Sequence, residues 1–346
     1  MSAITEQEIS APIQPVAPAS VLINRPPRPM LARDADAMYW MSRYVERSEH
    51  VARLLLVNAN LLIDVGDLAP SMQNRLWQNI LTVLRLPDVP EDPDQQIGWT
   101  IQKSLTFDAK NPNSLYSCLS RARENARGIR ENISSEMWES LNTLYWSIRS
   151  EEAHQRYDES PDGFWRSIMN SSMLFQGLTD QTMAHDQRWQ FAQLAKHFER
   201  ADVTCRIIET KHEILASSEA MAESTVRNIN WMAVLRCCCS IEAYRRRHIG
   251  DMDPLKVSAF LLLEKSFPRS VRFSVHAAYQ AISQIRIGVN PGFIDPAERI
   301  LGRLDAHMEY AELEEILANG LPAYLQNIQS ALSDAAMAVQ KAYFLH

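Results

Sequence analysis

The sequence predicts an all-α protein that folds as a large multi-helix bundle. Apolar residues recur along most of the chain with the spacing of amphipathic helices. No stretch between turn signals alternates β-branched and polar residues as a half-buried strand would. Only 10 glycines occur among 346 residues, too few for a strand-rich chain that needs many tight turns, and 46% hydrophobic residues suffice for a substantial core.

The first 29 residues differ in composition from the rest of the chain. They contain prolines at six positions among alanines and small polar residues. Because this composition cannot form a packed helix or core, we predict a disordered tail over 1–29 and a single helical domain over 30–346. The alternative is a pseudo-repeat with halves near 30–160 and 161–346, since Ser160-Pro161-Asp162-Gly163 marks a turn near the midpoint and is the only plausible internal boundary.

Helix start and stop signals place the predicted helices in order. They span about 34–65, 72–86, a short segment around 99, 115–132, a segment restarted by Ser134 and Ser135, 164–177, 186–216, 229–248, 297–317 and 322–344. The clearest starts are Asp253-Pro254 and Asp295-Pro296, because each pairs an N-cap acid with a proline in the first turn.

The predicted 34–65 helix has charged residues within its apolar face. At about 100° per residue, Glu49 falls in the middle of that face, and Glu46 and Arg53 flank it. Arg53 lies one turn after Glu49, where an ion pair can form. Because an unpaired buried carboxylate is costly, we expect its partners to be specified elsewhere in the chain.

The same charged pattern occurs a second time. Glu46, Arg47, Glu49 and Arg53 recur with the same spacing as Glu199, Arg200, Asp202 and Arg206. Further acids and arginines lie on two other predicted helices, namely Arg121, Glu124, Arg127, Glu242 and Arg245. The repetition favours a duplicated unit, and we expect four helices to turn acids and arginines inward.

Three interpretations of these charges remain open at this point. They form solvated ion pairs, a structural network that fixes the register of the bundle, or a polar pocket. Such a pocket would bind an anionic or zwitterionic peptide, with arginines holding carboxylates and acids holding an amine. If catalysis occurs, Glu49 or Asp202 is the candidate general acid or base, since burial raises a carboxyl pKa and nearby arginine opposes the rise.

Several blocks of the chain resemble the bacterial Alpha-E family, an all-helical family with a Glu-Arg motif. The blocks are Tyr39-Trp40-Met41 with Glu46-Arg47-Ser48-Glu49, Ala122-Arg123-Glu124-Asn125-Ala126-Arg127 with Ile133-Ser134-Ser135-Glu136-Met137-Trp138-Glu139, Phe198-Glu199-Arg200-Ala201-Asp202, Glu242-Ala243-Tyr244-Arg245-Arg246 with Phe267-Pro268-Arg269-Ser270-Val271, and Gly302-Arg303-Leu304. Departures from the family pattern are Ser42 in place of glycine and Lys196-His197 in place of Arg-Tyr.

Members of this family accompany circularly permuted ATP-grasp proteins and transglutaminase-like proteins. The resemblance therefore implies a helical partner or peptide-binding subunit of an amide-bond-forming, peptide ligase-like system, with those proteins as partners. The alternative is a stand-alone enzyme that acts on peptide or amino-acid amides through Glu49 and Asp202. A weaker alternative is a metal-dependent bundle, because Glu151-x-x-His154 and Glu209-x-x-His212 have the ligand spacing of ferritin-like sites.

Bulk properties exclude other classes of function. A net charge of −7 and a pI near 5.8 argue against a nucleic-acid surface. No segment has the length and apolarity of a transmembrane helix, so no membrane partner is expected. Five cysteines show neither a disulfide framework nor metal-ligand spacing, which indicates a reducing, cytoplasmic location. Because glycine-rich phosphate loops are missing, we expect no nucleotide bound by those routes and no cofactor.

Overall fold

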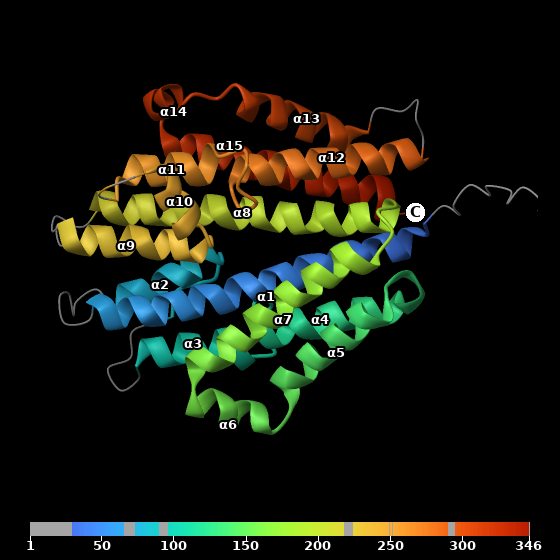
Figure 1. Cartoon of the computed structure of the whole chain (residues 1–346), viewed down its shortest axis with the longest axis horizontal. Helices are drawn as coiled ribbons and strands as arrows, with labels where there is room; N and C mark the ends of the chain where they lie inside the picture. The colour runs from blue at the N-terminus through green and yellow to red at the C-terminus, as the bar shows by residue number, and fades with distance from the viewer. Residues whose placement is uncertain are drawn as a thin grey trace, which may run out of the picture.

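The computed structural model describes residues 30–65, 73–89, 96–217, 224–248, 250, 252–289 and 295–345. These residues form fifteen α-helices and no strand, which confirms the all-α prediction (Figure 1). The predicted tail over 1–29 lies outside the described residues. Within those ranges, no helix combines the length and apolarity needed to cross a bilayer.

The helices before the chain midpoint follow most of the predicted bounds. They are α1 (Ala32–Val65), α2 (Gln73–Val83), α3 (Ile97–Phe107), α4 (Leu115–Gly128), α5 (Ser135–Arg149), α6 (Glu152–Glu159) and α7 (Pro161–Thr182). Side-chain caps explain two of the starts. Ser114 Oγ accepts a hydrogen bond from Ser117 N at the start of α4, and Ser134 Oγ accepts one from Met137 N at the start of α5.

The later helices complete the bundle. They are α8 (Gln187–Ser217), α9 (Ser224–Cys237), α10 (Ile241–Arg247), α11 (Pro254–Leu263), α12 (Val271–Val289), α13 (Pro296–Glu309), α14 (Leu313–Asn319) and α15 (Leu321–Val339), which ends in a short π-helical turn (Gln340–Phe344). The two predicted acid-proline starts are confirmed. Asp253 Oδ1 accepts hydrogen bonds from the backbone at the start of α11, and Asp295 Oδ1 does the same for α13.

Two long helices, α1 and α8, run through the middle of the molecule and pack against each other. On one side α1 also packs against α4 and α7, while on the other side α8 packs against α12 and α15 (Figure 1). One hydrophobic cluster extends through all of these helices and includes the fully buried Trp165 and Trp231. This packing brings the two copies of the charged pattern to the same interface, since one lies on α1 and the other on α8.

The predicted turn at Ser160-Pro161-Asp162-Gly163 coincides with the junction of α6 and α7, where Ser160 lies between the two helices. Ser160 is the C-cap of α6 and the N-cap of α7, and its Oγ accepts a hydrogen bond from Gly163 N at 3.2 Å. Pro161 occupies the first helical position, where it loses no hydrogen bond, so a motif typical of turns starts a helix here. A junction between two helices does not by itself divide the chain into two units, so the pseudo-repeat stays a prediction.

Two predicted helices are broken in the structure. The helix predicted over 229–248 ends at Cys237 and restarts at Ile241, because Cys239 adopts a left-handed backbone with φ 53°. Ser240 N and Oγ both donate to the Leu235 carbonyl, which caps the first helix. The helix predicted over 297–317 is likewise divided into α13 and α14.

Candidate functional site

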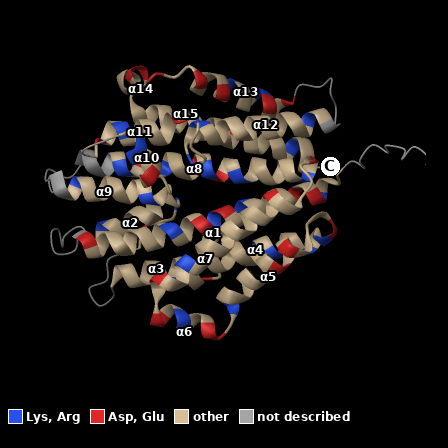
Figure 2. Ribbon diagram, in the orientation of Figure 1, with Lys and Arg blue, Asp and Glu red and all other residues tan. Residues whose placement is uncertain are grey.

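The two Glu-Arg pairs of α1 and α8 contact each other crosswise. Arg200 Nε donates to Glu46 Oε1 at 2.6 Å, and Arg47 Nε donates to Glu199 Oε1 at 2.6 Å. Each glutamate thus pairs with the arginine of the other helix rather than with its own neighbour in the sequence. Figure 2 shows acidic and basic positions along both α1 and α8. Reciprocal pairing of this kind is what a duplicated unit would produce.

Both glutamates are almost inaccessible to solvent and have several donors. Glu199 is 1% exposed and also accepts hydrogen bonds from Arg43 Nε at 2.9 Å and Arg47 Nη2 at 3.0 Å. Glu46 is equally buried and accepts a further bond from the Gln176 amide of α7 at 3.2 Å. The bidentate contacts of Arg47 and Arg200 fix the position of α1 against α8.

A second level of ion pairs lies one turn further along each helix. Arg53 pairs with Glu49 on α1, and Arg206 pairs with Asp202 on α8. Glu49 also contacts Arg269, whose Nη2 lies 3.0 Å from Glu49 Oε2. Arg269 belongs to the segment between α11 and α12, and Thr204 of α8 holds it in place by donating to the Arg269 carbonyl at 3.1 Å.

The arginines keep the buried glutamates ionised. Burial by itself would raise the pKa of Glu46, but the charges of Arg200 and Arg269 outweigh burial and lower the pKa to about 2. Burial likewise opposes ionisation of Glu49, yet Arg269 and Arg53 lower its pKa to about 2. A carboxylate in this condition has no proton to donate at neutral pH and is a weak base, which argues against Glu49 as a general acid or base.

Glu46, Glu49 and His50 form the one cluster of possible metal ligands among the described residues, with ligand atoms within 4.8 Å of one another. His50 Nδ1 lies 2.9 Å from the Glu46 carbonyl, so it is the protonated nitrogen, and Nε2 faces Arg269 Nη1 at 3.3 Å. A metal cation would have to displace guanidinium groups that already neutralise both acids. The site therefore fits an ion-pair network and does not fit a metal.

The motifs of the weaker metal alternative lie on different helices. Glu151 and His154 are at the start of α6, where both are exposed and the His154 ring stacks on Phe107 at 4.1 Å. Glu209 lies on α8 and accepts a hydrogen bond from the Gln329 amide at 2.9 Å. Figure 1 shows α6 and α8 in separate layers of the bundle, so the two pairs do not share a ligand set.

The expectation that four helices turn acids and arginines inward is wrong for two of them. Residues Arg121, Glu124 and Arg127 of α4 and Glu242 and Arg245 of α10 are exposed. Glu124 pairs with Arg127 on the surface at 2.8 Å, and Tyr244 rather than Glu242 faces the core of α10. Polar residues three or four positions apart occur on solvated and buried faces alike, so spacing did not distinguish these cases.

The predicted site residues did not include two arginines of the network. Arg43 lies one turn before Glu46 on the same face, so its contact with Glu199 was accessible to the helical periodicity that identified Glu46. Arg269 lies outside any helix, and no periodicity predicts the direction of its side chain. Its place in a block that resembles the family was the one available signal.

A polar pocket of about 140 Å³ opens beside this network. Its walls come from α1, the end of α2, α8 and α15, and they include Arg43, Arg85, Asp202 and Gln329. Arg43 contacts the buried Glu199 behind the pocket, and Asp202 is paired with Arg206. Arg85 differs from these, since among the described residues its guanidinium has a hydrogen bond to the Gln329 amide oxygen and no ion pair with a carboxylate.

The backbone at Arg85 is unusual for a residue with a side chain. Its φ is 54°, and Leu86 N donates to the Leu81 carbonyl at 2.9 Å, as in the glycine-ended cap of a helix. Glycine would be favoured there by about 1 kcal/mol. Arginine at this position directs a cation to the edge of the polar pocket, which indicates a role for the side chain.

Comparisons with known proteins agree with this architecture. Uncharacterized proteins of Mycobacterium bovis and Mycobacterium tuberculosis are 23% identical to the chain over 328 residues, covering 86% of it. The chain spans 35% of the length of these relatives. No solved structure matches the chain. Residues 30–344 match the Alpha-E family, described as a predicted alpha-helical domain with a conserved ER motif, and the chain therefore belongs to that family.

Proposed function

We propose that the protein is a peptide-binding helical subunit of an ATP-grasp amide-bond-forming system, and that its polar pocket holds the charged end of the peptide. The observation that carries this proposal is the guanidinium of Arg85, which reaches the pocket without a carboxylate partner among the described residues. A guanidinium in this condition is a ready site for a ligand carboxylate, which it can bind through two parallel hydrogen bonds.

The opposite charge in the pocket favours a zwitterionic ligand. Asp202 lies on another wall of the same pocket and its side chain is 16% exposed. A free amino acid carries both an amine and a carboxylate, and a short peptide carries one at each end. Apolar side chains of Phe198 and Leu332 complete the lining and suit the aliphatic part of a peptide.

In this proposal the buried Glu-Arg network positions the pocket and does not bind the peptide. Glu199 forms ion pairs with Arg43 and Arg47, and the crosswise pairs fix α1 against α8. Binding sites require walls held rigidly by a second layer of contacts, which these ion pairs supply. The low pKa of Glu49 gives no support to a stand-alone enzyme, so we do not extend the proposal to catalysis.

The proposed role as a subunit rests on two grounds: the proteins that accompany members of this family, and the greater length of the relatives. In the mycobacterial proteins the matched region is 35% of the chain, so this domain is joined there to a longer polypeptide. We propose a circularly permuted ATP-grasp protein as the principal partner, with a transglutaminase-like protein as a second one, and place the system in the cytoplasm, as cysteine usage predicts.

The partner is tested by co-expression with the neighbouring ATP-grasp protein. We expect a complex in size-exclusion chromatography at micromolar concentration, or a change in the ATPase rate when this protein is added. If the two proteins elute separately and neither alters the activity of the other, the subunit proposal is wrong.

The pocket is tested by calorimetric titration with trialanine and with its C-terminal amide. Trialanine should bind at least about 10-fold more tightly, since a charge-assisted contact contributes about 1.5–3 kcal/mol. Arg85→Gln should remove this preference, whereas Arg127→Gln, a change at an exposed arginine of α4, should preserve it. Equal binding of both peptides to the unmodified protein would contradict the role of Arg85.

A further inference from the structure

A second pocket lies between α1, α2, α8 and α9, and the peptide proposal does not use it. Its cavity measures about 50 Å³, enough for several water molecules or part of a small organic ligand. It shares no lining residue with the polar pocket. Any function of this cavity can therefore hold or fail independently of the proposed function.

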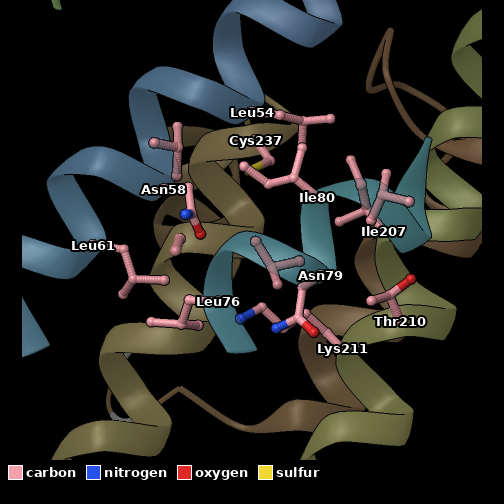
Figure 3. Close-up of a pocket in the computed structure, with 14 residues that line it drawn as sticks. Leu54, Asn58, Leu61, Leu76, Asn79, Ile80, Ile207, Thr210, Lys211 and Cys237 are labelled. Carbon is pink, nitrogen blue, oxygen red and sulfur yellow. The ribbon is translucent and has the colours of Figure 1, made fainter. Parts of the chain in front are cut away.

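Most of the cavity wall is aliphatic. Leu54 and Leu61 of α1, Leu76 and Ile80 of α2 and Ile207 of α8 form much of the lining. Figure 3 shows these side chains around the pocket, with Asn58, Asn79 and Lys211 among them. A wall of this kind favours an alkyl group over a charged or strongly hydrated molecule.

Two amide groups in the lining have hydrogen-bond donors without a partner. Asn58 is 9% exposed, and its Nδ2 is buried and makes no hydrogen bond within the described part of the chain. The Nδ2 of Asn79 is in the same condition. A buried donor without an acceptor is unfavourable, and a bound ligand that supplies acceptors would remove this cost at both amides.

Lys211 supplies a cation to the same pocket. Its Nζ donates to Asn230 Oδ1 at 2.7 Å, and an ammonium group has three N–H bonds in all. The groups that face it from the packed helices are Asn230 and Cys237 of α9 and the neutral amides of the lining. Burial raises the pKa of the Cys237 thiol to about 12, so the thiol is neutral at pH 8. No acidic residue is among the lining residues in the described ranges.

We propose that this pocket binds a small aliphatic carboxylate. The alkyl chain would lie against the leucine and isoleucine wall, and the carboxylate would accept hydrogen bonds from the Asn58 and Asn79 amides and the Lys211 ammonium. All of the unsatisfied polar atoms identified in the lining are donors, so the ligand must supply acceptors. A cationic ligand is disfavoured because it would meet Lys211 and no carboxylate.

Calorimetric titration of the full chain with butanoate, hexanoate and octanoate tests this proposal. We expect saturable binding of at least one acid with a Kd of roughly millimolar or tighter, given the efficiency usual for ligands of this size. Hexylamine, which has the same alkyl chain and the opposite charge, should bind at least about 10-fold more weakly. N-acetyl-leucine distinguishes the end of a peptide from a free fatty acid as the source of the carboxylate.

Variants connect binding to the named groups. Lys211→Met should weaken hexanoate binding about 10-fold or more, and Lys211→Arg should restore part of it. Lys110→Met, at an exposed lysine, is the matched control and should leave the Kd unchanged. Circular dichroism of each variant establishes that it is folded, and Asn79→Leu provides a second test that does not alter the charge.

Proton uptake gives a readout that a general loss of stability would not change. Burial lowers the pKa of Lys211 to about 8, so part of the ammonium is deprotonated at pH 8 in the free protein. A bound carboxylate raises the pKa of Lys211. The protein should therefore take up protons when hexanoate binds at pH 8, and almost none when it binds at pH 6. The proposal is wrong if none of the acids binds, if hexylamine binds as well as hexanoate, or if Lys211→Met leaves the Kd and the proton uptake unchanged.

Discussion

Replacement of Glu199 by glutamine should strongly destabilise the domain. The variant keeps the shape of the side chain but leaves Arg43 and Arg47 without their shared counter-charge at a position that is 1% exposed. Breaking a buried ion pair in this way costs about 3–5 kcal/mol. A domain of this size unfolds with an entropy of about 0.6 kcal/mol/K, so the melting temperature should fall by about 5–8 °C.

Urea unfolding followed by circular dichroism at pH 7 measures this loss. The free energy of unfolding should decrease with little change in the slope against urea, because the folded and unfolded surfaces remain the same. Glu124→Gln is the control, since Glu124 pairs with Arg127 on the surface with its side chain 53% exposed, and it should change stability by less than about 0.5 kcal/mol. A loss below about 1 kcal/mol for Glu199→Gln would refute the structural role of the buried network.

Three further predictions concern pH and the backbone. Stability should fall as the pH is lowered from 4.5 towards about 2, because the unfolded chain then binds protons that folded Glu46 resists; urea midpoints at pH 6 and pH 3 that coincide would contradict this. Cys239→Gly should raise the free energy of unfolding by about 0.5–1 kcal/mol by relieving a left-handed backbone, and a lower urea midpoint would count against it. Gly98→Ala should cost about 1–3 kcal/mol because a Cβ there meets the indole of Trp77, whereas Gly128→Ala, with open space, should not destabilise; equal melting temperatures for the two variants would show that the contact is unimportant.

Local signals in the sequence accounted for much of the fold. Asp253 and Asp295 start helices because each acid caps the backbone and the proline directly after it fixes φ. No local signal in the sequence predicts the helix end at Cys237, since the residues around it are compatible with a continuous helix. Cys239 nevertheless has a left-handed backbone, which its residue type does not predict.

The candidate site was predictable to the extent that helical periodicity determines it. Glu46, Glu49 and Glu199 lie within apolar faces, and their burial follows from that position. Periodicity cannot say which arginine each acid meets, since this depends on how α1 and α8 are placed against each other. Arg85 was invisible to the same reasoning, because its position follows from a helix end and not from a face.

Charged side chains on the outer helices show the limit of spacing as a signal. Glu124 and Arg127 have the separation of an ion pair, just as Glu49 and Arg53 do, yet one pair is exposed and the other buried. The difference lies in the neighbours of each charge, since Glu49 is flanked by apolar residues that pack in the core. Composition around a charged pair therefore carries more information on its burial than the spacing within the pair.

The crosswise pairing of the two Glu-Arg motifs is tested most directly by a double-mutant cycle. Stability is measured by urea unfolding for Glu46→Gln, Arg200→Met and the double variant, and the coupling energy is obtained from their differences. The contact at 2.6 Å between Glu46 and Arg200 predicts a coupling of roughly 2 kcal/mol, while the distant surface residue Glu124 should show almost none with Arg200. Additive effects of Glu46→Gln and Arg200→Met would contradict the pairing of α1 with α8 through these residues.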